Sequence, residues 1–157
     1  MSFANNQVFG DDVTATYSTE VYPLGTERLV LGSQTGVGDQ VYVFVKADAN
    51  LVLGDVLVHK TTSPNGNVSL QGTSAASPAA FVGVSTGTVT VATAPYCWVV
   101  KRGVVTAKVA SYTQDRGLIL STTAASFHTT NTATDSVCGY GLGAASGGLA
   151  SVYVSAL

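Results

Sequence analysis

The chain has 157 residues, a formal net charge of −2 and only 10% charged residues, against about 25% in an average soluble domain. This length fits one domain with a single core, and the weak negative charge argues against a nucleic acid or an anionic membrane surface as partner. Ser, Thr, Asn, Gly and Pro interrupt the uncharged stretches, so none supplies the ~20 successive apolar residues of a membrane-crossing helix.

The first twenty residues differ from the rest of the chain. Apolar residues stand singly among polar ones here, and Pro23 interrupts any strand that would continue. We expect 1–20 to be an extended arm that orders against a partner, the alternative being an ordinary first strand with a frayed end. The opening residues do not have the pattern of a secretory signal, which a mature chain could have lost. The candidate contact residues of the arm are Phe3, Val8, Phe9, Val13 and Tyr17.

Strand patterns dominate the chain. Valine and threonine are frequent, apolar and polar residues alternate, and no window of eleven residues keeps a helical period without Gly or Pro. The expected strands lie in 13–18, 24–32, 38–47, 50–62, 68–72, 81–94, 95–110, 116–123, 137–145 and 147–157. We therefore predict an all-β fold, a small β-barrel or β-sandwich, as a single domain 21–157 behind an extended N-terminal arm.

Turn chemistry explains several polar positions. Asn65-Gly66 within SPNGN predicts a tight hairpin. Asp39 and Asp55 each follow a glycine where a strand begins, which suits a turn without catalysis. We expect the Ala/Ser-rich stretch 72–80 and the stretch 124–136 to be loops.

One short stretch resembles an active-site motif. GTSAASP (72–78) is similar to the segment that holds the nucleophilic serine of subtilisin-like proteases, which would make Ser74 the nucleophile. A serine needs a histidine base and a carboxylate to orient it. His59 precedes Ser74 by only 15 residues, neither histidine stands in a His-Gly-Thr motif, and β-patterned sequence follows where that family has a long helix. We therefore expect no catalytic residue and no enzymatic activity.

The metal-ligating residue types are too scattered for a metal site. His59, Cys97, His128 and Cys138 have no short spacing between any two, so no metal and no cofactor are expected. Both cysteines stand in apolar, strand-like sequence, which favours buried free thiols. We expect His59 to end a hairpin strand and His128 to lie in a threonine-rich loop.

The aromatic residues allow two interpretations. They form either a sugar-stacking face, as in carbohydrate-binding modules, or part of the core. A single tryptophan and the lack of a regularly spaced Trp/Tyr/Asp set favour the core. The residues concerned are Tyr22, Tyr42, Phe44, Tyr96, Trp98, Tyr112 and Tyr153.

Three segments follow one another in a distinctive order along the chain. YVFVKADANLVLGDVLV (42–58) is a β-ribbon followed by a Gly-Asp turn into an apolar strand. FVGVSTGTVTVATAPYCWVVKRGVVTAKVA (81–110) leads from a Gly-Val strand into a Tyr-x-Trp-Val strand and Arg-Gly-Val. GYGLGAASGGLASVYV (139–154) is a Gly-rich strand pair. In this order the three segments resemble the head-decoration (capsid cement) proteins of tailed bacteriophages, whose closing Gly-rich strand pair is similar to 139–154. The SPNGN hairpin and the two expected loops depart from the pattern.

The resemblance implies a non-enzymatic protein, made in the host cytoplasm and bound to the outer capsid surface of the virion. Its implied partners are the major capsid protein, whose lattice it stabilises, and copies of itself in a homotrimer, with no nucleic acid and no membrane. We expect arm 1–20 to lie on the capsid or to reach a neighbouring copy by strand addition. Low charge suits a surface that packs in a lattice, but it also suits a monomer kept soluble by hydroxyl groups. Two alternatives are another virion β-protein, such as a tail or fibre component, and a glycan-binding β module.

Overall fold

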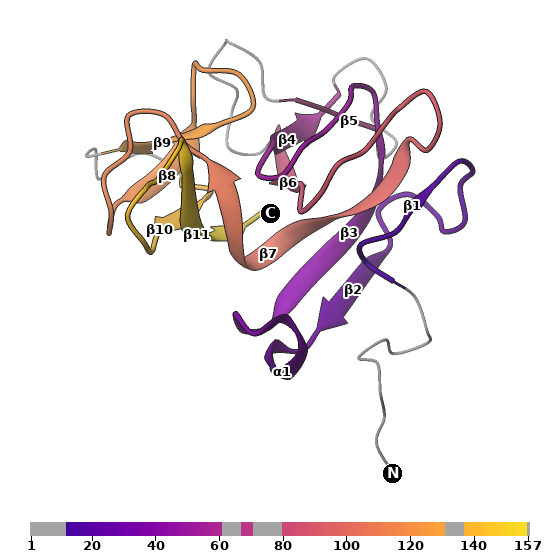
Figure 1. Cartoon of the computed structure of the whole chain (residues 1–157), viewed down its shortest axis with the longest axis horizontal. Coiled ribbons are helices and arrows are strands. Elements are labelled where there is room, and N and C mark those ends of the chain that lie inside the picture. The colour runs from indigo at the N-terminus through magenta and orange to yellow at the C-terminus, as the bar shows by residue number, and fades with distance from the viewer. Residues whose placement is uncertain (1–11, 61–66, 71–79, 131–136, 157) are drawn as a thin grey trace.

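The computed structural model describes residues 12–60, 67–70, 80–130 and 137–156 (Figure 1). Within these residues, eleven strands form one sheet, and one four-residue helix, α1 (Gly32–Thr35), accompanies it. The all-β prediction is confirmed. The strands are β1 (Thr16–Tyr17), β2 (Glu27–Val30), β3 (Gln40–Ala47), β4 (Val56–His59), β5 (Asn67–Leu70), β6 (Phe81–Val84), β7 (Tyr96–Lys108), β8 (Gly117–Leu120), β9 (Phe127–Thr130), β10 (Gly139–Gly141) and β11 (Leu149–Ser155).

The strands pair in a long antiparallel series with a side bridge. The series runs β2-β3-β7-β11-β10-β8-β9, and β1 pairs with the start of β7. This side bridge is a second connection between β3 and β7, made by the paired strands β5, β4 and β6, and in it β5 runs parallel to β3. At the two ends of the series, β2 and β9 each have one neighbour among the described strands. The sheet as a whole is therefore not closed into a barrel.

Strand β7 belongs to both parts of the sheet (Figure 1). Its first half, Tyr96–Arg102, pairs with β3, and its second half, from Arg102 to Lys108, pairs with β11. Gly103 lies between the halves with φ 118°, and a Cβ there would come within 2.7 Å of the Asp39 carbonyl oxygen. Only glycine adopts this backbone conformation readily, so the joint between the halves depends on it.

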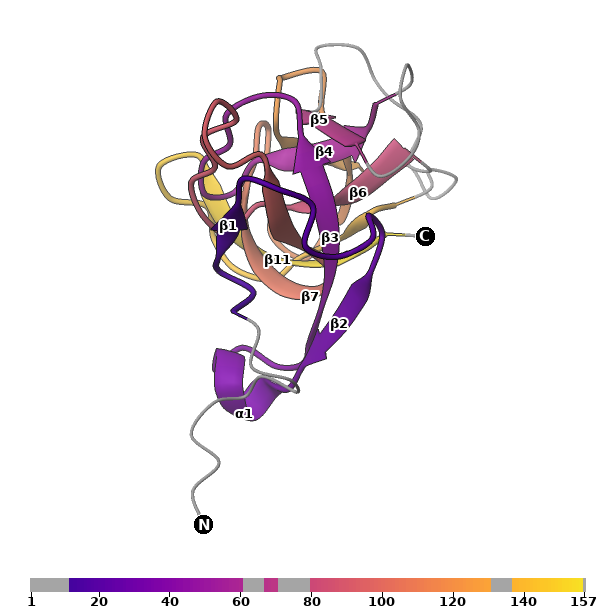
Figure 2. The same ribbon diagram turned by 90° about the vertical axis from the view of Figure 1, so that its right-hand side faces the viewer.

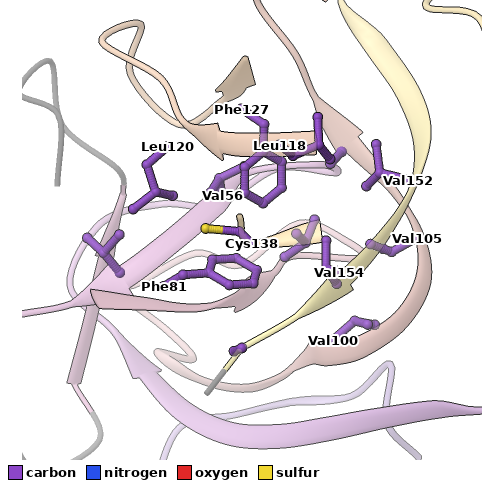
Figure 3. Packing of buried hydrophobic residues seen from close by; sticks show 14 of the residues in the cluster. Val56, Phe81, Val100, Val105, Leu118, Leu120, Phe127, Cys138, Val152 and Val154 are labelled. Carbon is purple, nitrogen blue, oxygen red and sulfur yellow. The ribbon is translucent and has the colours of Figure 1, made fainter. Parts of the chain in front are cut away.

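The buried side chains form two clusters on opposite faces of β3 and of the first half of β7. Val43, Val45 and Val99 belong to the smaller cluster, which also contains side chains of β4, β5 and β6. Phe44 and Trp98 belong to the larger cluster. The second half of the chain completes the larger cluster, as Figure 3 shows for Leu118, Phe127, Cys138, Val152 and Val154. Burial on both faces explains why these strands read as continuous apolar runs.

Two predicted details are wrong. Strand β9 lies inside the stretch 124–136 expected to be a loop, and His128 is therefore in a strand, paired with Ile119 of β8. Phe127 is fully buried and anchors this short strand, while Ala125 (φ 57°) makes the turn before it. The expected strand 81–94 ends at Val84, because the segment after β6 leaves the sheet and returns only as a bridge to Leu51.

Several turn and side-chain predictions are confirmed. Strands β4 and β5 form an antiparallel hairpin with His59 as the last residue of β4; residues 61–66 between them lie outside the described part. Asp39 accepts a hydrogen bond from the Gly32 amide at 2.7 Å, and Asp55 accepts one from the Val52 amide at 2.8 Å. The buried Asp55 carboxylate also pairs with the Lys108 ammonium at 2.6 Å and so joins the start of β4 to the end of β7.

Both cysteines are free and buried, as predicted. Burial raises the pKa of the Cys97 thiol to about 12. Burial likewise raises the pKa of the Cys138 thiol to about 12, and a backbone hydrogen bond opposes the shift only in part. Both side chains are therefore neutral thiols that contribute apolar packing.

Candidate interaction surfaces

The described part of the predicted arm lies on the domain itself. Val13 and Tyr17 are half-buried against the larger cluster. The Tyr17 ring lies 5.9 Å from that of Phe44, and β1 pairs Thr16 with Cys97. The other predicted contacts, Phe3, Val8 and Phe9, lie outside the described residues, and the role of 1–11 stays a prediction.

Of the candidate catalytic and metal-ligating residues, the structure describes the two histidines and the two cysteines. Ser74 lies outside the described residues. Among those that are described, no group of three or more His, Cys, Asp or Glu side chains can hold a metal ion. His59 ends β4 and His128 lies in β9, on separate parts of the sheet. None of the described helices is long and apolar enough to cross a membrane.

A small cavity lies between β1 and the segment after β6. Its volume is about 50 Å³, and its walls include Thr14, Thr86, Cys97 and Trp98. The buried indole N–H of Trp98 has no acceptor within the described part of the chain. Ligand pockets are typically of about 300–1,000 Å³, so this cavity is too small for anything beyond solvent.

The predicted aromatic residues divide into a packed group and an exposed one. Tyr22, Phe44 and Trp98 lie within 5.1 to 5.4 Å of one another, measured between ring centroids. The Arg28 guanidinium lies over the Tyr22 and Trp98 rings at 4.9 and 5.2 Å. Core packing is therefore confirmed for this group, whereas Tyr153 is exposed.

We call the first exposed apolar surface the tip: Leu29, Leu31 and Val37, whose exposed fractions are 54%, 47% and 49%. Figure 2 shows α1 and the adjoining ends of β2 and β3 below the rest of the sheet. Leu29 and Leu31 are two positions apart on extended backbone and so project to the same side. The backbones of Gly32 and Gly38 touch, since a Cβ on Gly32 would lie 2.6 Å from the Gly38 Cα. Because Gly32 and Gly38 are in contact, the residues that precede them, Leu31 and Val37, lie close together beside the edge strand β2.

We call the second surface the tyrosine face: Tyr140 of β10, Tyr153 of β11 and Val104 of β7. The strand register places these three side by side across neighbouring strands. Tyr140 is 54% exposed and Tyr153 is 37% exposed. Sequence reasoning missed Tyr140. The available signal was its place between two glycines in a strand pattern, because alternate residues of a strand face opposite sides of the sheet.

Comparisons with known proteins give one informative similarity. No protein-family model matches the sequence, and no curated protein matches it. The fold is similar to that in the crystal structure of head fiber gp8.5 N base in bacteriophage phi29, with a TM-score of 0.52 and 17% sequence identity. The alignment covers 74% of this chain and 94% of that chain. At this identity, the similarity shows the fold alone.

Proposed function

We propose that this chain is a structural protein of a bacteriophage virion, a non-enzymatic decoration (cement) protein on the outer surface of the head. The observation that carries the proposal is the similarity in fold to a phage head-fibre base, most of which the alignment covers. The low charge of the chain supports it, because a surface of Val, Thr and Ser packs in a lattice with little desolvation of charge.

The tip is the surface we assign to the major capsid protein. It is aliphatic and lies beside β2, whose outer edge has no neighbour among the described strands, so a partner that covers the side chains of Leu29 and Leu31 could also pair with the backbone. Each such contact is small. Many copies on one shell, arranged as homotrimers, supply the strength by avidity. The arm 1–20 extends the contact over the shell or to a neighbouring copy.

A second candidate function is the base of a head fibre. The fold similarity favours it directly, because the similar structure is the N base of such a fibre. The two functions differ in distribution over the particle. A decoration protein covers the shell at three-fold or quasi-three-fold positions, whereas a fibre base occupies only the attachment points of fibres.

The test is a reconstruction of phage heads incubated with the purified protein. Density at three-fold or quasi-three-fold positions supports decoration, density at sparse fibre positions supports the second candidate, and a bare outer surface overturns both. The triple variant Leu29→Ser, Leu31→Ser, Val37→Ser is expected to lose at least about tenfold in affinity for heads, since each exposed aliphatic side chain contributes roughly 1 kcal/mol when buried.

The matched control is Val52→Ser with Leu53→Ser, which changes two side chains that are each 45% exposed in the segment before β4. Affinity for heads should be retained in this control. Equal loss in both variants would show that the tip has no special role. The absence of enzymatic activity is tested separately: labelling by a serine-reactive fluorophosphonate that disappears in Ser74→Ala would contradict it.

A further inference from the structure

We propose that the tyrosine face is a binding site for a neutral saccharide. This activity is separate from attachment to the head and does not depend on it. The proposal rests on the placement of Tyr140 and Tyr153, on the side chains around them and on the absence of charge along their strands.

The two tyrosines form one outward platform. Val152 and Val154 are fully buried and point into the larger cluster (Figure 3), so Tyr153 between them projects from the opposite face of β11. Tyr140 is its direct cross-strand partner. Backbone hydrogen bonds lie on both sides of this pair, from the Ser155 amide to the Cys138 carbonyl at 2.8 Å and from the Leu142 amide to the Ser151 carbonyl at 3.0 Å.

The backbone beneath the platform is closely packed. A Cβ on Gly139 would overlap the carbonyl oxygen of Tyr153, and a Cβ on Gly141 would overlap the side chain of Tyr112. Tyr112 is itself fixed by a hydrogen bond that its hydroxyl donates to the Gly143 carbonyl at 2.8 Å. The glycines on either side of Tyr140 therefore hold β10 tightly in place, and the platform needs little ordering when a ligand binds.

Several neighbours of the platform carry hydroxyl groups, and Leu142, which is 44% exposed two positions after Tyr140, adds an apolar side chain. Thr106 and Ser151 are exposed cross-strand partners on one side of the Val104–Tyr153 pair, and Ser155 is exposed on the other side. Residues 117–130 and 137–156 contain no Asp, Glu, Lys or Arg. Charged residues border the face: Arg102 and Lys108 lie in strand β7, and Arg116 directly precedes Gly117, the partner of Tyr140 in β8.

This chemistry fits a sugar better than a protein or a charged ligand. A neutral saccharide presents C–H faces that pack on aromatic rings and hydroxyl groups that exchange hydrogen bonds with Ser, Thr and Tyr side chains. Protein interfaces are enriched in tyrosine but depleted in serine, and an anionic ligand would require basic side chains within the face. The tip, with aliphatic side chains at a turn, has the opposite character.

Both surfaces can be occupied in one molecule. Strands β3, β7 and β11 separate β2 from β10 in the sheet, which is a path of roughly 19 Å across four strand spacings. A copy held through the tip therefore leaves the tyrosine face accessible to a glycan.

The experiment is affinity electrophoresis of the full chain in native gels that contain dextran, hydroxyethyl cellulose or galactomannan, with polygalacturonate as a charged comparison. Retardation is expected in at least one neutral gel, and Tyr140→Ala and Tyr153→Ala should each weaken it about tenfold. Tyr140→Phe and Tyr153→Phe keep the rings and should retain most of it. The tip variant Leu29→Ser, Leu31→Ser serves as the control that leaves it unchanged.

Four results would overturn the proposal. The first three are no retardation in any neutral gel, retardation that the tyrosine variants leave unaltered, and retardation by polygalacturonate alone. A fourth is a change of oligomeric state in Tyr140→Ala or Tyr153→Ala by analytical ultracentrifugation, which would identify the face as a subunit interface. Melting temperatures within a few degrees of the unsubstituted chain ensure that folded proteins are compared, and the phenylalanine variants keep the test valid if an alanine variant is unstable.

Discussion

The two halves of β7 lie in different surroundings. In the first half, Cys97 and Val99 face the smaller cluster while Trp98 and Val100 face the larger one, so both faces are buried. In the second half, Val105 and Ala107 are buried but Thr106 is exposed. The first half therefore packs against the core on both faces, whereas the second half leaves one face exposed to a partner. The tyrosine face lies on this one-sided part of the sheet.

The largest effect is expected from a substitution of Gly103, the joint between the two halves of β7. Gly103→Ala places a Cβ against the Asp39 carbonyl at a φ of 118°, which combines backbone strain with overpacking and should lower the free energy of unfolding by about 3–5 kcal/mol. Urea denaturation measures the change. Gly87→Ala is the control, because nothing lies within 4 Å of its Cβ position, and it should stay within about 0.5 kcal/mol of the unsubstituted protein. Equal stability of both variants would show that the joint does not depend on glycine.

Truncation of one valine in each half should separate two-sided from one-sided burial. Val99 is fully buried, so Val99→Ala should cost about 2 kcal/mol through lost transfer energy and a cavity. Val104 is only half-buried, and Val104→Ala should cost less than about 1 kcal/mol. The urea midpoints of the two variants check the difference, provided that the free energy of unfolding depends equally steeply on urea concentration in both. Similar losses would mean that the second half is as enclosed as the first.

The burial of Cys97 in the first half of β7 can be tested by the dependence of stability on alkaline pH. The pKa of Cys97 is raised from 9.0 to about 12 in the folded state, so the unfolded chain loses its proton first. The contribution of the protonated thiol to the free energy of unfolding is fully present below pH 9. It falls as pH rises towards 12, by about 1.4 kcal/mol per pH unit for each such thiol.

Urea midpoints at pH 8 and pH 10 measure this slope. Cys138 contributes in the same direction, so Cys97→Ala should remove about half of the thiol slope and Cys97→Ala with Cys138→Ala all of it. Burial also raises the pKa of Tyr42, which leaves a residual slope of the same sign. An unchanged slope in the double variant would contradict the assignment to the thiols.

The sequence predicts much of this fold because alternation and turn residues are local signals. The β4–β5 hairpin follows from Asn65-Gly66, and β3 and β7 follow from their valine-rich runs. Strand β9 was missed because FHTT is short and its burial depends on Phe127 meeting residues far away in the chain. A strand that is buried on both faces has a continuous apolar sequence. Such a sequence does not show which side chains belong to which cluster, so the two clusters could not be predicted.

The surfaces were less predictable than the strands. The tip depends on the contact between Gly32 and Gly38, and α1 between them is too short to leave a helical period. The tyrosine face depends on register, since only the pairing of β10 with β11 brings Tyr140 beside Tyr153. Exposure of an aromatic side chain is decided by which face the rest of the chain covers.

The pairing of β3 with β7 also has a consequence for how fast the chain folds. Almost fifty residues separate the end of β3 from the start of β7, and β11, which completes the other half of β7, comes forty residues later still. Such non-local pairing places folding in the slow range of milliseconds to seconds that is typical of all-β topologies. Until β7 is in place, β3 exposes both of its apolar faces and an unpaired edge. We therefore expect the yield of folded protein to depend on temperature and on chaperones during synthesis far more than the stability of the finished sheet would suggest.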